Sequence, residues 1–134
     1  MKFAGYAAVF GTPDAARDTI MPGAFAVTLA ERHSGSSGPL PLFWQHRPDQ
    51  RIGWIERIGE DARGLRVVAR VDNPNSHPAA LLRTGSVSGL SFGYRARAAR
   101  HAPQGRVLEA VELFEVSLVT HPLQHGARVH FVSL

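Results

Sequence analysis

The chain has 134 residues, 44% of them hydrophobic, and its 15 Lys and Arg outnumber its 11 Asp and Glu, for a net charge of +4. This length suits one domain over residues 1–134, and the absence of cysteine excludes disulfides, thiol nucleophiles and cysteine–zinc sites, so chemistry must come from Ser, His, Asp, Glu or the backbone. No stretch approaches the ~20 apolar residues of a membrane span, and the N-terminal stretch lacks the hydrophobic core of a signal peptide, so we expect neither membrane insertion nor secretion.

Apolar runs separated by turn sequences predict six strands and two short helices. In chain order we expect a strand over 2–10, a helix over 22–32, strands over 40–46, 51–59 and 64–72, a helix from 76 to 85, and strands over 86–98 and 106–120. The strand at 64–72 has the clearest alternation, because apolar residues such as Leu65 and Val67 lie at every second position. Ser76 is the expected N-cap of the second helix, and Gly85 its expected stop.

These elements predict an α+β fold class. The small strand-rich domain is expected to hold a curled, mainly antiparallel sheet that forms a barrel, with the helices filling gaps between strands. Residues 33–39, rich in Gly and Ser, are expected to form a flexible loop within this one domain.

Ser91 is the first candidate for chemistry, in the stretch "GLSFG". Gly89 and Gly93 bracket it within a strand, where glycine is used when the backbone bends or when another chain approaches closely, as a substrate would. A β-bulge or a barrel corner explains the same glycines without function. The stretch is not a nucleophile elbow, because no helix follows it.

The second candidate is Glu115 in the apolar stretch "ELFEVSLVT". A carboxylate there is costly unless it is paired or hydrogen-bonded. On strict alternation Glu115 shares a strand face with Leu113 and Ser117, whereas Glu112 lies on the opposite face. Exposure at a sheet edge would explain either glutamate without function.

A hairpin with its turn near Ala102 and Pro103 would bring Ser91 opposite or diagonal to Phe114 or Glu115. His46 ends the apolar run "LFWQH", and a third strand could deliver it to the same place. Serine, histidine and carboxylate together suit base-activated nucleophilic attack.

Other chemistry has weaker support. His121 and His125 are four residues apart, but Pro122 and Gly126 argue against the helix that would make them a metal pair. No phosphate-binding loop is present. The arginines are scattered apart from residues 94–100, whose alternation suggests one solvated strand face rather than a nucleic-acid patch.

The sequence resembles the prohead (capsid-maturation) serine proteases of tailed phages and gene transfer agents, a family related to the herpesvirus assemblin proteases. The resemblance covers most of the chain, in the family's order, through "GYAAVFG", "DTIMPGAF", "LPLFWQH", "RIGWIERI", "DARGLRVVARV", "ALLRTGSVSGLSFGY" and "LFEVSLVTHP". It implies an assemblin-like fold and an acyl-enzyme serine endopeptidase.

The resemblance also implies roles for single residues. His46 matches the family's base, and Ser91, rather than Ser86 or Ser88, matches its nucleophile. Glu115 matches the third member, with backbone N–H groups near Gly93, or a nearby arginine, as expected oxyanion support.

Two residues compete with Glu115 for the third role. His121 stands where the family more often has an apolar residue, which makes it a rival orienter, and Glu112 is the other alternative.

By the same resemblance, the substrate is the scaffold region of the major capsid protein, processed inside the immature capsid in the cytoplasm of a bacterial host. Other prohead components are expected partners, and a homodimer is left open. No cofactor, metal or membrane is expected, and nucleic acid is not an expected partner. The alternatives are a catalytically inactive capsid-assembly or scaffold module of the same fold and, more distantly, a basic nucleic-acid-binding domain.

Overall fold

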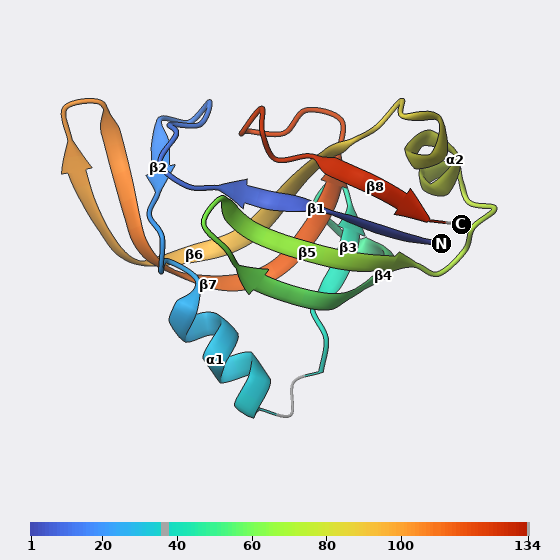
Figure 1. The fold of residues 1–134 in the computed structure, drawn as a ribbon, viewed down its shortest axis with the longest axis horizontal. Helices are drawn as coiled ribbons and strands as arrows, with labels where there is room; N and C mark the ends of the chain where they lie inside the picture. The colour runs from blue at the N-terminus through green and yellow to red at the C-terminus, as the bar shows by residue number, and fades with distance from the viewer. Residues whose placement is uncertain (36–37, 134) are drawn as a thin grey trace.

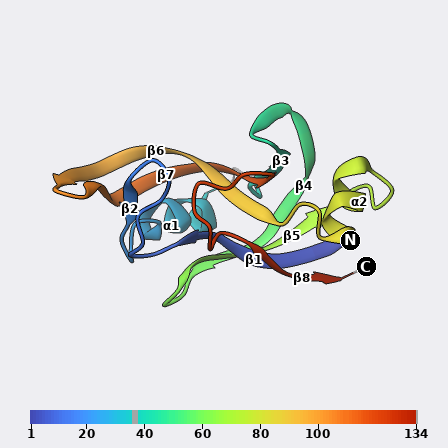
Figure 2. The ribbon, with the colours of Figure 1, turned by 90° about the horizontal axis from the view of Figure 1, so that it is seen from above.

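The computed structural model describes residues 1–35 and 38–133, which form a curved sheet with two short helices (Figures 1 and 2). Its elements are β1 (Lys2–Val9), β2 (Asp18–Ile20), α1 (Ala26–Ser34), β3 (Pro41–Trp44), β4 (Arg47–Glu60), β5 (Gly64–Val71), α2 (His77–Thr84), β6 (Gly89–Ala102), β7 (Gly105–Val119) and β8 (Val129–Ser133). All six predicted strands and both helices are present. The short strands β2 and β8 were not predicted, and residues 36–37 of the expected loop lie outside the described residues.

The sheet is mainly antiparallel, as predicted. Its strand order is β2-β7-β3-β4-β5-β1-β8, with β6 on β7. Only β2 and β3 run parallel to their neighbour β7 within the described part of the chain. The long β6–β7 hairpin projects from the body as an arm in both views (Figures 1 and 2).

The sheet does not close, so the predicted barrel is not confirmed. β8 pairs with β1, and it approaches β6 only through one isolated bridge, Gly89 to Arg128. Two backbone hydrogen bonds flank this bridge, from Leu90 N to Ala127 O (2.9 Å) and from Val129 N to Ser88 O (2.8 Å). Beyond the bridge β6 follows β7 into the arm, and therefore runs away from β8 (Figure 1).

The core confirms the predicted alternation of β5. Leu65, Val67 and Ala69 are buried, whereas Arg66 and Arg70 point to solvent. Each apolar residue thus faces the core while its charged neighbours stay hydrated.

The first helix begins later than predicted. Residues 22–25 form a turn in which Gly23 has φ +91°, and the Glu60 carboxylate accepts hydrogen bonds from Gly23 N and Phe25 N at 2.8 Å each. This anchoring from β4 holds the turn, so α1 starts only at Ala26.

The second helix has the predicted ends. Ser76 Oγ accepts a hydrogen bond from Ala79 N (3.3 Å), and Gly85 closes the helix with φ +77°. Neither α1 nor α2, the two helices of the described chain, is long and apolar enough to cross a membrane.

Candidate active site

His46 lies in the tight turn between β3 and β4. Gln45 and His46 both have positive φ, +55° and +60°, a backbone conformation that costs non-glycine residues free energy and has to be held by neighbours. Strand β7 holds it. Gln45 N donates to Leu118 O (3.0 Å), and the Gln45 side chain donates to Thr120 Oγ1 (2.6 Å) and accepts from Thr120 N (3.2 Å).

Glu115 reaches its position through a β-bulge in β7. Gly93 pairs with Glu115 and the next residue, Tyr94, pairs with Leu113, so Phe114 is the extra residue. The bulge shifts the alternation: Leu113 is buried opposite Tyr94, and the prediction that Leu113 shares the face of Glu115 is wrong.

Ser91 lies directly opposite Ser117 in the β6–β7 ladder and is 8% exposed. Glu115 is two residues from Ser117 on the same strand, so it is the diagonal neighbour of Ser91, as one of the predicted registers required. Opposed residues of an antiparallel pair point to the same face, with Cβ atoms about 4.5–5.5 Å apart. Ser91, Ser117 and Glu115 therefore share one face.

The two glycines around Ser91 make room for the protein's own atoms. A Cβ on Gly93 would collide with Glu115 Oε1, and a Cβ on Gly89 would lie 2.7 Å from the Pro122 ring and from Val119 O. Gly93 lets the Glu115 side chain cross over β6.

His46 and Glu115 form the central contact of the site. Nδ1 of His46 lies 2.5 Å from Glu115 Oε1. An ionised carboxylate only accepts, so Nδ1 carries the hydrogen and Nε2 has a free lone pair. The hydrogen bond and negative charge of buried Glu115 raise the pKa of His46 above its ordinary value, against the opposing effect of desolvation.

Ser117, which the sequence did not mark as functional, joins this contact. Its hydroxyl donates to Glu115 Oε2 (2.5 Å) and accepts from His46 N (3.1 Å). A hydroxyl in the apolar run "VSLV" could have drawn attention, because a buried hydroxyl requires a partner.

The alternative residues lie elsewhere. Glu112 accepts from Arg95 (2.6 Å) and Arg97 (3.3 Å) on the neighbouring strand, and His121 is exposed in the turn after β7. The described residues contain no group of three or more His, Cys, Asp or Glu that could hold a metal ion.

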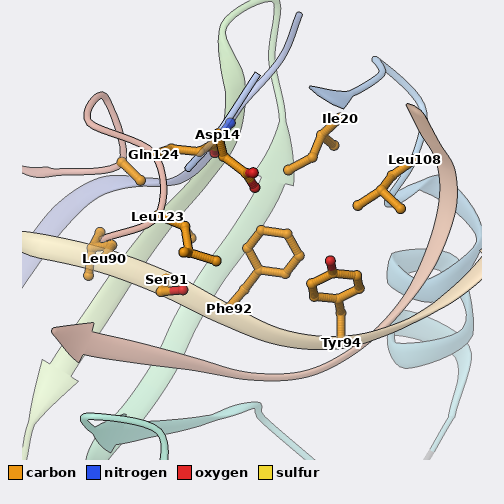
Figure 3. A pocket seen from close by; sticks show the side chains of 11 residues that line it. Asp14, Ile20, Leu90, Ser91, Phe92, Tyr94, Leu108, Leu123 and Gln124 are labelled. Atoms are coloured by element: carbon orange, nitrogen blue, oxygen red, sulfur yellow. The ribbon is translucent and has the colours of Figure 1, made fainter. Parts of the chain in front are cut away.

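A pocket opens beside Ser91 (Figure 3). Phe92 and Tyr94 of β6 point into it, and the loop after β7 contributes Leu123. Ser91 borders it from β6, but its side chain belongs to the opposite strand face, with Ser117 and Glu115. The other lining residues are mainly apolar: Ala7, Ile20, Leu90, Leu108 and Ala127, with the polar Asp14 and Gln124.

Several solved viral proteases have this fold. The bacteriophage T4 capsid assembly protease gp21 superposes with a TM-score of 0.70 at 16% identity, covering 90% of this chain and 82% of that one. The protease of Kaposi's sarcoma-associated herpesvirus, solved with a hexapeptide phosphonate inhibitor, gives 0.62 at 16% identity over 96% and 63%. Varicella-zoster virus protease gives 0.61 at 18% over 96% and 62%. The chain therefore has the assemblin-like fold of these enzymes.

Sequence comparison then gives the family. The prohead protease of Enterobacteria phage HK97 is 30% identical over 134 residues, covering 95% of this chain and 58% of the relative. The capsid polyprotein of Pseudomonas phage PAJU2 is 27% identical over 129 residues, covering 88% of this chain and 18% of that protein. The chain thus spans little more than half of the first relative. The family model of the caudovirus prohead serine proteases matches residues 1–134, and the chain belongs to this family.

Proposed function

We propose that this domain is a serine endopeptidase in which Ser91 is the nucleophile, His46 the base and Glu115 the residue that orients His46. The observation that carries the proposal is the contact between His46 Nδ1 and Glu115 Oε1, on the strand face that also bears Ser91. Membership of a serine protease family supports the same reaction class.

Cleavage would proceed through an acyl-enzyme. Ser91 Oγ bonds to the scissile carbonyl carbon while its proton passes to His46 Nε2, and the Glu115 carboxylate stabilises the resulting imidazolium. The C–N bond then breaks and His46 returns the proton to the leaving amine. Water, activated by His46, hydrolyses the ester and restores Ser91. Backbone N–H groups near Gly93 or a nearby arginine would stabilise the oxyanion.

This mechanism sets the direction of the pH profile. His46 acts as a base only when it is neutral, and Glu115 raises its pKa. Cleavage should therefore rise with pH, with a midpoint above the ordinary histidine value of about 6.5.

The proposed substrate is the scaffold region of a major capsid protein, processed inside an immature capsid in the bacterial cytoplasm. The names of the relatives support this context, since one is a prohead protease and another a capsid polyprotein. Other prohead components and a second copy of the chain are further proposed partners.

The test is co-expression with the cognate major capsid protein, followed by intact-mass measurement of the capsid subunit. We expect a shortened subunit. Ser91→Ala should slow cleavage by ~10⁴-fold or more, because the acyl-enzyme can no longer form. Ser88→Ala is the matched control, since its hydroxyl contacts Arg128 instead, and it should cleave almost normally.

Other outcomes would contradict the proposal. An uncut subunit with the unmutated chain would identify an inactive assembly module, and cleavage by Ser91→Ala but not by Ser88→Ala would refute the nucleophile. For the third member, Glu115→Gln should be nearly inactive and His121→Phe active. The reverse pair of results would transfer the orienting role to His121.

A further inference from the structure

Ser117 hydrogen-bonds both to the backbone N–H of His46 and to the carboxylate that contacts the His46 ring. It is fully buried, between Val116 and Leu118 on β7. A backbone N–H can only donate, so the contact from His46 N (3.1 Å) uses a lone pair of Ser117 Oγ, and the single hydroxyl hydrogen goes to Glu115 Oε2 (2.5 Å).

The hydrogen bonds therefore form a closed circuit. From His46 N it passes through Ser117 Oγ to Glu115 Oε2, and from the other oxygen, Oε1, it returns to Nδ1 of the same histidine. The Glu115 carboxylate thus restrains the ring of His46 directly and the His46 backbone through Ser117. Because each carboxylate oxygen has its own donor, the plane of the carboxylate is fixed.

Two features of His46 make this restraint necessary. Its backbone is left-handed, with φ +60°, and its side chain is 42% exposed, so packing alone does not fix the ring. A small misplacement of a catalytic group, on the order of 1 Å, costs about 10²-fold in rate.

We propose that Ser117 is a positioning residue: it touches no substrate, and its hydroxyl aligns the Glu115 carboxylate with the His46 ring while anchoring the His46 backbone. This inference rests on the proposed function, because the residue that Ser117 positions is His46, the proposed base.

The first test measures His46 without any need for cleavage. In a Ser91→Ala background, the imidazole shifts of His46 are followed by NMR against pH, with and without Ser117→Ala. Losing the hydroxyl frees the carboxylate to rotate away from Nδ1, so the pKa of His46 should fall toward its ordinary value. Ser88→Ala, in the same background, should leave that pKa unchanged. An unchanged His46 pKa in folded Ser117→Ala would overturn the proposal.

Ser117→Cys guards against a variant that fails to fold. The thiol approximates the volume of the hydroxyl but is a weak hydrogen-bond donor, so the pKa of His46 should fall here too. Ser117→Thr retains the hydroxyl and should keep the pKa near that of the parent. If the Ser117→Thr and Ser117→Cys variants both fold and share one His46 pKa, the hydroxyl has no positioning role.

The second test uses the active chain with a cleavable capsid peptide. Ser117→Ala should lower kcat by about 10²-fold and leave KM nearly unchanged, since substrate contacts are intact. A rise in KM with normal kcat would place Ser117 in substrate binding instead. If the unmutated chain cleaves nothing while the His46 pKa still responds to Ser117, the proposed function fails and the positioning role stands.

Discussion

Gly93 shows how one missing side chain can shape a site. It faces Glu115 across the β6–β7 ladder, and the carboxylate occupies the space that a Cβ would need. The Glu115 side chain follows a path over Gly93 of β6, and its Oε1 contacts Nδ1 of His46. Only glycine at position 93 leaves that path open.

We therefore expect Gly93→Ala to displace the Glu115 carboxylate from His46 Nδ1 and to reduce turnover by about 10²-fold, with the fold retained. Gly59→Ala is a matched control, because Gly59 is also in a strand and nothing lies within 4 Å of its added Cβ. Capsid-peptide cleavage and circular dichroism measure the two effects. Gly93→Ala with parental turnover would show that Glu115 does not need this path.

Single residues were predictable where their chemistry conflicted with their surroundings. His46 and Glu115 stood out as polar groups in apolar runs, and the structure brings them into contact. Ser117 was missed because its role depends on His46, which is brought to it by the parallel pairing of β3 with β7, a contact that no local pattern contains.

Among the elements, the loop from Thr120 to Ala127 depends on one buried side chain. Gln124 behaves like a short strand partner, since its Oε1 accepts from Val9 N and its Nε2 donates to Val9 O, both at 2.8 Å. This pair fixes the loop to β1, and the loop lines the pocket beside Ser91.

Replacing Gln124 with Leu would leave both Val9 groups without these partners. We expect Gln124→Leu to lower the free energy of unfolding by about 1–3 kcal/mol, measured by urea denaturation. Gln104→Leu lies in the exposed β6–β7 turn and should change it by less than about 0.5 kcal/mol. Equal losses in the two variants would mean that the Gln124 contacts add nothing to stability.

Elements with strong local patterns were predictable, and those defined by distant partners were not. The alternation of β5 and the Ser76 and Gly85 caps of α2 depend on residues that are close together in the sequence. β2 has only three residues and is a strand because β7 pairs with it, and α1 begins late because Glu60 holds the preceding turn. Closure of the sheet likewise depends on how β6 and β8 meet in space.

At the scale of the whole molecule, ion pairs join the β6–β7 arm to the N-terminal part of the chain, and the more buried one is between Asp18 and Arg106. Asp18 on β2 accepts from Arg106 Nε (3.0 Å) and Nη2 (2.9 Å) on β7, and Tyr94 of β6 donates to it at 3.3 Å. The hydrogen bonds from Arg106 lower the pKa of Asp18 despite its burial.

A lowered folded-state pKa stabilises the protein above the unfolded-state value, about 3.9, and this stabilisation is lost as pH falls through the folded-state pKa. Asp18→Asn should therefore lower the free energy of unfolding by about 1.5–3 kcal/mol at pH 7. The difference from the parent should shrink below about pH 4. Thermal and urea unfolding across pH 3–7, with the exposed Asp49→Asn as control, would measure it. A difference that is constant over this range would exclude Asp18 ionisation as its source.

The single bridge between Gly89 and Arg128 also determines which parts of the domain can move apart. Separating β6 from β7 breaks a ladder of thirteen residue pairs, whereas separating β6 from β8 breaks the bridge, its two flanking backbone bonds and the hydrogen bond from Arg128 to the Ser88 hydroxyl. The strands β3, β7 and β6, on one side of this junction, carry Ser91, Glu115 and the turn with His46. The loop that carries Leu123 is tied to β1, on the other side. Because Ser91, Glu115 and the His46 turn are all joined through β7, a movement between β6 and β8 would leave the mutual distances of the three proposed catalytic groups unchanged.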